Sequence, residues 1–355
     1  MTSLAHSPAT RAAPSVQRAV GLWLLLCAAM VFVMALIGAI TRLSESGLSI
    51  MEWAPISGVL PPFTEAEWQR LFALYREIPE YKALPGGMTL DEFKTIFWWE
   101  YIHRLWGRLI GLVFALPFVW FLATGRLTRR QVWPLLGVFA LGALQGGMGW
   151  YMVASGFAER QDVSQYRLVA HLALALAIYG WLLWLAWRAL WPRPARSGPG
   201  SSSGLVAALI AFTGLVALTI LSGGFVAGLN AGLIYNTVPL MGGQLVPDDY
   251  AFLQPWIANH FENPATAQFN HRVLAVVTLL AALGLWLWAR RRGAGALLAP
   301  VAAMTLLQFG LGIATLLALV PVWLGALHQA GALVLFSLAL WALYRLPERQ
   351  RPLYV

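Results

Sequence analysis

The chain has 355 residues, of which 59% are hydrophobic and only 11% are charged, and its formal net charge is +9. This composition excludes a water-soluble domain, because so few charged groups could not hydrate its surface. The positive charge does not indicate nucleic-acid binding either, since the basic residues gather in alternate segments between apolar runs.

Apolar runs of about 20 residues, the length that crosses a bilayer, recur along the chain. They predict membrane helices at 19–41, 97–123, 132–154, 165–190, 204–228, 268–289, 295–319 and 322–345. Seven spans are the alternative, because Pro321 leaves almost no loop between the last two runs. The first run is long for a signal peptide and is not followed by a small-residue cleavage pattern, so we interpret it as a helix.

The distribution of charge orients these helices. Alternate loops and the two ends of the chain hold fourteen of the 24 basic residues and one of the 15 acidic residues, Glu348. The fourteen are Arg11, Arg18, Arg126, Arg129, Arg130, Arg188, Arg193, Arg196, Arg290, Arg291, Arg292, Arg345, Arg349 and Arg351. The positive-inside rule assigns such segments to the cytoplasm. We therefore expect both termini to be cytoplasmic, which requires an even number of spans.

The segments outside the apolar runs suggest the domain organisation. Residues 1–18 and 347–355 are expected to be cytoplasmic tails, the first of them disordered, and 193–203, rich in Pro, Gly and Ser, a flexible cytoplasmic linker. The outward loop 42–95 is long and acidic, and its two amphipathic stretches begin with capping-box patterns at Thr64 and Thr89. The corresponding loop at 229–266 is shorter and more neutral.

The two parts of the chain on either side of the linker, 19–192 and 204–346, are related by an internal repeat. The most specific correspondence is between WEYIHR at 99–104 and AQFNHR at 267–272. LQ at 144–145 corresponds to LQ at 307–308, and AH at 170–171 corresponds to LH at 327–328. Gly38, Leu43 and Pro55 of the first half correspond to Gly224, Leu229 and Pro239 of the second. Both halves start in the cytoplasm. We therefore predict an all-α integral membrane protein whose eight helices form two pseudo-symmetric four-helix bundles, related by an axis along the membrane normal.

Four of the six histidines lie in apolar runs, one on each even-numbered helix: His103, His171, His271 and His328. Each follows the start of its run by roughly four to seven residues, a depth of about 6–10 Å from the outward face. Ionisable side chains inside a membrane usually have a function. Two histidines on facing helices of a bundle are typical of bis-imidazole haem ligation. Four separate hydrogen-bonded histidines are the alternative, which leaves the pairing unexplained, and a zinc site would need further ligands that are not repeated.

Charged and amide residues accompany the histidines. Arg104, Arg108 and Arg272 could pair with outward-pointing haem propionates or reach the interface as snorkelling side chains. Gln145 and Gln308, each beside glycines, are interpreted as helix-packing residues.

Glu100 distinguishes the two halves. It precedes His103 by three residues, nearly on the same helix face, whereas the corresponding residue before His271 is the neutral Gln268. This difference predicts that chemistry takes place in the first half, with Glu100 as its catalytic residue, and that the second half holds a permanent redox cofactor. The alternative is that Glu100 pairs with Arg104 to fix the start of the helix.

Four motifs together resemble the haem A synthase family, over nearly the whole chain from about Val20 to Tyr344: TRLSESGLS at 41–49, FWWEYIHRLWGR at 97–108, FNHR at 269–272 and HQ at 328–329. The resemblance implies that all four membrane histidines are haem ligands. His271 and His328 would hold a resident haem b, and His103 and His171 would face the substrate haem o. Glu100 matches the essential glutamate of that family.

The activity implied by the resemblance is oxidation of a ring methyl of haem o to a formyl group by successive hydroxylations, with water as the expected oxygen source. The product, haem a, would serve cytochrome oxidase. The resemblance also implies a bacterial inner-membrane location with the haem sites toward the periplasm, and contacts with lipid, a haem o synthase and oxidase assembly factors. A homo-oligomer is compatible with the sequence. The first outward loop lacks a cysteine pair, as in the branch typical of alphaproteobacteria and mitochondria.

Two other functions remain open at the level of sequence. One is a dihaem electron-transfer subunit similar to a membrane cytochrome b, although four level histidines favour side-by-side cofactors over stacked ones. The other is a transporter of paired bundles without haem. Extracted haem o or haem a beside haem b would exclude the first alternative, and a colourless protein would favour the second.

Overall fold

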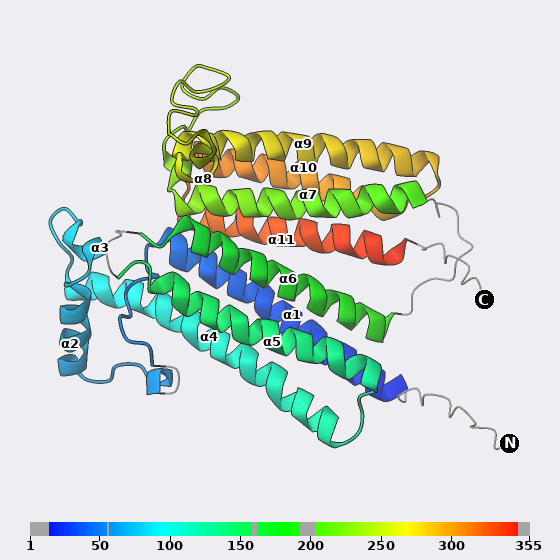
Figure 1. The fold of residues 1–355 in the computed structure, drawn as a ribbon, viewed down its shortest axis with the longest axis horizontal. Helices are drawn as coiled ribbons and strands as arrows, with labels where there is room; N and C mark the ends of the chain where they lie inside the picture. Colours follow the sequence, from blue (N-terminus) through cyan, green and yellow to red (C-terminus); the bar gives the residue numbers. More distant parts are fainter. Residues whose placement is uncertain (1–13, 55–56, 158–161, 192–202, 347–355) are drawn as a thin grey trace.

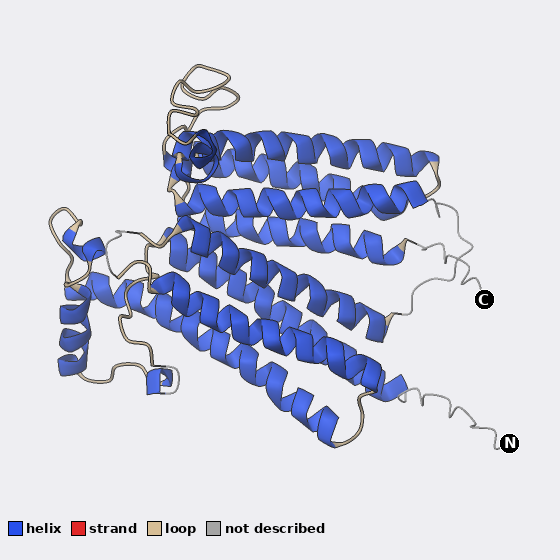
Figure 2. Cartoon of the chain, viewed as in Figure 1, coloured by secondary structure: helices blue, strands red, loops and turns tan. Residues whose placement is uncertain are grey.

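The computed structural model describes residues 14–54, 57–157, 162–191 and 203–346. In these ranges eight helices are long and apolar enough to cross a membrane, and all regular structure is helical (Figure 2). This confirms the predicted all-α membrane fold with eight spans and removes the alternative of seven.

The membrane helices are α1 (Pro14–Leu43), α4 (Leu90–Ala123), α5 (Arg129–Val153), α6 (Gln165–Leu190), α7 (Ser203–Gly228), α9 (Pro264–Arg291), α10 (Gly295–Leu317) and α11 (Val322–Arg345). The outward segments contain α2 (Glu65–Tyr75), α3 (Pro79–Lys82), α8 (Asn259–Glu262) and three short 3₁₀ turns, η1 (Ser57–Val59), η2 (Ala231–Leu233) and η3 (Trp256–Ala258).

Two of the expected boundaries need correction. Helix α1 begins at Pro14, inside the segment expected to be a disordered tail, and α7 begins at Ser203, the last residue of the expected linker. Residues 1–13, most of the linker and the tail 347–355 lie outside the described residues, as does Pro55 of the repeat.

Helix caps fix the starts of α4 and α9, the helices that carry His103 and His271. At the start of α4, the Thr89 hydroxyl accepts from the Glu92 backbone N–H at 3.3 Å, and the Glu92 carboxylate accepts from the Thr89 N–H at 2.7 Å. This capping box starts α4 in the outward loop, ahead of the predicted span at 97–123. At the start of α9, the Asn263 side chain accepts from the Ala265 N–H at 2.9 Å. Both helices are therefore rigid before they reach their histidines.

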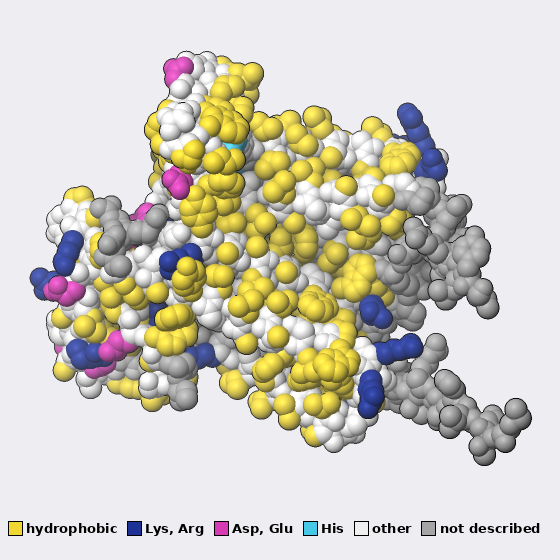
Figure 3. Space-filling view, viewed as in Figure 1, with side chains coloured by type: hydrophobic (Ala, Val, Ile, Leu, Met, Phe, Trp, Pro, Cys, Tyr) yellow, Lys and Arg dark blue, Asp and Glu magenta, His cyan; other side chains and the backbone are white. Residues whose placement is uncertain are grey.

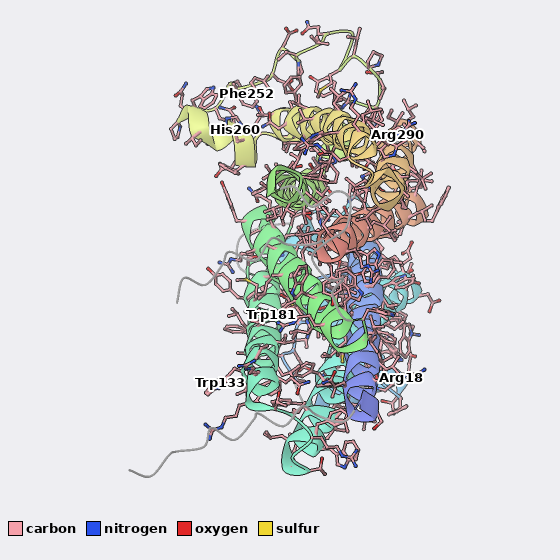
Figure 4. All side chains as sticks on the ribbon, turned by 90° about the vertical axis from the view of Figure 1, so that its right-hand side faces the viewer. Arg18, Trp133, Trp181, Phe252, His260 and Arg290 are labelled. Carbon is pink, nitrogen blue, oxygen red and sulfur yellow. The ribbon has the colours of Figure 1, made fainter. Side chains whose placement is uncertain are left out.

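The eight helices form two four-helix bundles, which lie one above the other in Figure 1 and are seen end-on in Figure 4. In the first bundle, α1 and α5 each pack against α4 and α6, and in the second, α7 and α10 each pack against α9 and α11. The histidine-bearing helices are thus diagonally opposite in each bundle. One difference breaks the symmetry: α4 and α5 pack against each other much less closely than their counterparts α9 and α10.

The bundles meet along a seam formed by α1, α6, α7 and α11. Small residues such as Ala186 and Ala339 are fully buried there, and their size lets the backbones approach closely. The Tyr179 and Ser337 hydroxyls, on α6 and α11, lie 2.8 Å apart across the seam. At the outward end, the Arg42 guanidinium donates to the Asn230 side-chain oxygen at 3.0 Å.

Charge is distributed unequally between the two ends of the molecule. Figure 3 shows an apolar belt around the bundles. On the face in view, the end where α1 begins shows arginine and lysine, whereas the opposite end shows acidic side chains together with arginine and lysine. The positive-inside rule predicts that the end where α1 begins faces the cytoplasm.

Candidate functional site

The four membrane histidines share one feature of packing: each ring lies against a glycine on a neighbouring helix that carries no membrane histidine. The pairs are His103 with Gly38, His171 with Gly149, His271 with Gly223 and His328 with Gly312. A Cβ at these glycines would lie 3.3, 3.2, 3.2 and 2.9 Å from the respective ring. Because the arrangement recurs at all four positions, the glycines make room for four inward-facing imidazoles.

The spacing of the second pair suits metal ligation. The ring centroids of His271 and His328 are 6.5 Å apart and the rings are nearly perpendicular, at 84°. Two metal–imidazole bonds of about 2.0–2.1 Å would separate the two nitrogens by about 4 Å, and the two ring radii make up the remainder. The pair therefore fits a metal held between two imidazoles.

The donor set favours a haem over a bare ion. In the described part of the chain no group of three or more His, Cys, Asp or Glu side chains could hold a metal. A protein site with only two ligands needs a metal whose other ligands come from elsewhere, and a haem macrocycle supplies four nitrogens. The remaining described histidine, His260, lies on α8 at the edge of the molecule, where it contacts Asn270 at 3.0 Å (Figure 4).

Gln145 and Gln308 were interpreted as packing residues, and in the structure each also contacts a membrane histidine. The Gln145 amide nitrogen lies 3.1 Å from His171 Nε2 and donates to the His171 carbonyl at 3.2 Å. The Gln308 amide nitrogen lies 3.1 Å from His328 Nδ1 and donates to the His328 carbonyl at 2.8 Å. Their recurrence at equivalent places in the repeat was the sequence signal of this contact.

Glu100 is buried, with 2% of its surface exposed, and both carboxylate oxygens are hydrogen-bonded. One oxygen accepts from the Ser49 hydroxyl at 2.8 Å and from the Ile50 N–H at 2.7 Å, and the other accepts from Arg104. Arg104 also donates to the carbonyls of Ile50 and Glu52 at 2.7 and 3.0 Å. The expected alternative, an ion pair between Glu100 and Arg104, is therefore present, and it clamps the outward loop onto α4.

The second half contains a neutral version of this clamp. Arg272 donates to the carbonyls of Tyr235 and Thr237 at 2.8 and 2.9 Å, and the Gln268 amide nitrogen donates to the Tyr235 carbonyl at 3.1 Å. Arg108 donates to the Ala54 carbonyl at 2.9 Å. All three arginines considered for propionate binding thus contact loop carbonyls, and their contact with propionates stays a prediction.

These features define a multi-pass membrane protein made of a duplicated four-helix bundle, with an intramembrane histidine pair in each half. The sequence profile of a family described as cytochrome oxidase assembly protein matches residues 21–340. A protein named heme A synthase from Rhodospirillum centenum is 52% identical over 99% of this chain and 95% of its own length. Proteins of the same name from Paramagnetospirillum magneticum and Nitrosospira multiformis are 49% and 47% identical, each over 94% of this chain and over 95% and 94% of their own lengths. The chain therefore belongs to the haem A synthase family.

Proposed function

We propose that this protein oxidises a ring methyl of haem o to a formyl group by successive hydroxylations, with water as the oxygen source, and so supplies haem a for cytochrome oxidase. The observation that carries the proposal is the duplicated histidine pair, each ring set against its own glycine, in a chain about half identical to proteins named heme A synthase.

The second half, 204–346, is the proposed site of the resident haem b, with His271 and His328 as axial ligands. Their centroid distance of 6.5 Å supports this assignment. A haem b held by two imidazoles would supply one-electron chemistry, while the protein sets its orientation and surroundings.

The first half, 19–192, is the proposed site of substrate haem o, facing His103 and His171. A substrate has to enter and leave, which the looser packing between α4 and α5 supports. On α5, additional Cβ atoms at Gly142, Gly146 and Gly147 would meet nothing within 4 Å, so this helix leaves open space along one side.

Glu100 is the proposed catalytic residue. It lies one helical turn before His103, and a carboxylate there could accept a proton from water or orient the water for attack. Because both oxygens have hydrogen-bond partners, this role requires Glu100 to exchange the Ser49 or Ile50 contact for the water. The same carboxylate also fixes Ser49 and Ile50 of the outward loop onto α4.

The proposed location is the bacterial inner membrane, with both termini cytoplasmic and the histidine pairs toward the periplasm. On the face in view, acidic side chains accompany the basic ones at the end away from the start of α1, whereas the end where α1 begins shows basic ones, and this asymmetry supports the orientation. The reaction requires a haem o synthase to supply its substrate and oxidase assembly factors to take up its product, and these are the proposed partners.

Alanine variants of the four histidines test the assignment of the halves. With haem o synthase co-expressed, His271→Ala and His328→Ala should lose haem b, measured as extracted pigment per protein. His103→Ala and His171→Ala should keep haem b and form no haem a. Normal haem b in both second-half variants would overturn the assignment, and wild-type pigment lacking haem o and haem a would indicate electron transfer alone.

A further inference from the structure

His271 has a hydrogen-bonding partner at one of its two ring nitrogens, Nδ1. Ser222 Oγ, on α7, lies 2.8 Å from His271 Nδ1, on α9. We propose that Ser222 is a positioning residue that holds His271 in the tautomer whose Nε2 carries the free lone pair. This inference rests on the proposed function, in which His271 is a ligand of haem b.

Hydrogen-bond accounting fixes the direction of the contact. The Ser222 hydroxyl donates its single proton to the Thr219 carbonyl of the preceding turn at 2.8 Å. With that proton on the carbonyl, the hydroxyl accepts from His271. The Thr219 carbonyl, which can only accept, is also a hydrogen-bond partner of His271, so both contacts favour a proton on Nδ1. A neutral imidazole has one N–H, which leaves Nε2 unprotonated, the state that a metal ligand needs.

The neighbour of Ser222 completes the arrangement. Gly223 is the glycine beneath the His271 ring, where a Cβ would come within 3.2 Å of Cε1. Consecutive residues of α7 thus admit the ring and fix its protonation. Such partners of a metal-ligating histidine set its orientation and increase its electron donation to the metal.

The first half has no serine at the equivalent position before the glycine that faces His103. The residue before Gly38, which faces His103, is Ile37, whose side chain has no hydrogen-bonding group. The second histidine of that half, His171, has a buried Nδ1 without a hydrogen-bond partner. The contrast agrees with a permanent cofactor in the second half and an exchanging substrate in the first.

The test compares Ser222→Ala with Ser222→Thr in the full-length protein purified with its haem b. The alanine variant should lose haem b to a haem acceptor 10–100 times faster, the range typical of lost partners of metal ligands. Its midpoint potential should rise by about 59 mV, the equivalent of a tenfold change for a one-electron couple. Threonine keeps the hydroxyl and should restore both values.

Ser337→Ala is the matched control, because Ser337 is also an intramembrane serine that donates to a carbonyl of the preceding turn, that of Leu333 at 2.7 Å. It should leave haem loss and potential unchanged. If Ser222→Ala does not fold, Ser222→Cys, with a weaker acceptor, should give an intermediate shift. Wild-type potential and haem retention in the Ala or Cys variant, or an equal shift in Ser337→Ala, would overturn the role of Ser222. Retention of haem b in His271→Ala would instead overturn the proposed function.

Discussion

Replacing Gly312 by alanine should displace His328 and so damage the second histidine pair. The new Cβ would lie 2.9 Å from His328 Cε1, whereas carbon atoms pack at about 3.5–4.0 Å, so the ring or helix must move by about 0.6 Å or more. Such overpacking costs about 1–3 kcal/mol. Alanine in place of glycine stabilises a helix by about 0.5–1 kcal/mol. The balance lies between about zero and a loss of about 2.5 kcal/mol, and in either case the ligand is displaced.

The assay is haem b per protein, with thermal unfolding in detergent measured on the same samples. Gly310→Ala is the control on the same helix, because an added Cβ there meets nothing within 4 Å, and it should keep full haem b. Gly149→Ala, beside His171, should lower haem a formation and spare haem b. Equal haem b in Gly312→Ala and Gly310→Ala would refute the idea that these glycines exist to admit the imidazoles.

Two further predictions concern carboxylates. Glu100→Gln should keep haem b and accumulate haem o or a hydroxylated intermediate. Formation of haem a at the wild-type level would exclude the catalytic role. Ser49→Ala keeps the carboxylate, so an equal loss of haem a formation in that variant would assign the effect to the contact between the loop and α4. The glutamine cannot keep all the hydrogen bonds of the carboxylate, because either orientation of the amide sets its NH₂ against a donor, the Ile50 N–H or Arg104. The mismatch costs about 1–3 kcal/mol. Burial raises the pKa of Glu80, in the outward loop, to about 8. Because this folded-state pKa exceeds the ordinary value of 4.5, the contribution of Glu80 to stability should fall as pH rises from about 4.5 to 8. The difference in thermal unfolding between the wild type and Glu80→Gln should therefore change over this pH range, and a constant difference would contradict the shift.

Much of the fold was predictable because its determinants are local. The lengths of the apolar runs predicted the eight spans, and the basic loops predicted that successive spans alternate in direction. The pattern at Thr89 predicted a helix start, which the capping box confirms. The four histidines stood out because imidazoles are rare in apolar runs. The repeat then predicted which of them share a bundle.

The rest of the site depends on contacts between distant segments. Glu100 is hydrogen-bonded to Ser49, about fifty residues earlier, because the outward loop folds back onto α4, and no periodicity reports that contact. Ser222 could not be distinguished from an ordinary intramembrane serine until α7 and α9 were placed side by side. The contact of Gln145 with His171 depends on how α5 packs against α6, so the sequence offered only the recurrence of the glutamine at Gln308 as a signal.

The seam between the bundles determines how the two halves can communicate. His171 and His328 belong to α6 and α11, two of the four seam helices, whereas His103 and His271 belong to helices on the outside of their bundles. The spacing between the inner two histidines is therefore fixed by the packing of fully buried small residues such as Ala186 and Ala339. Over the residues that the structure describes, the loosely packed pair α4 and α5 does not include a helix that contacts the second bundle closely. In the proposed function, electrons passing from one half to the other would therefore cross a path whose length is set by this seam.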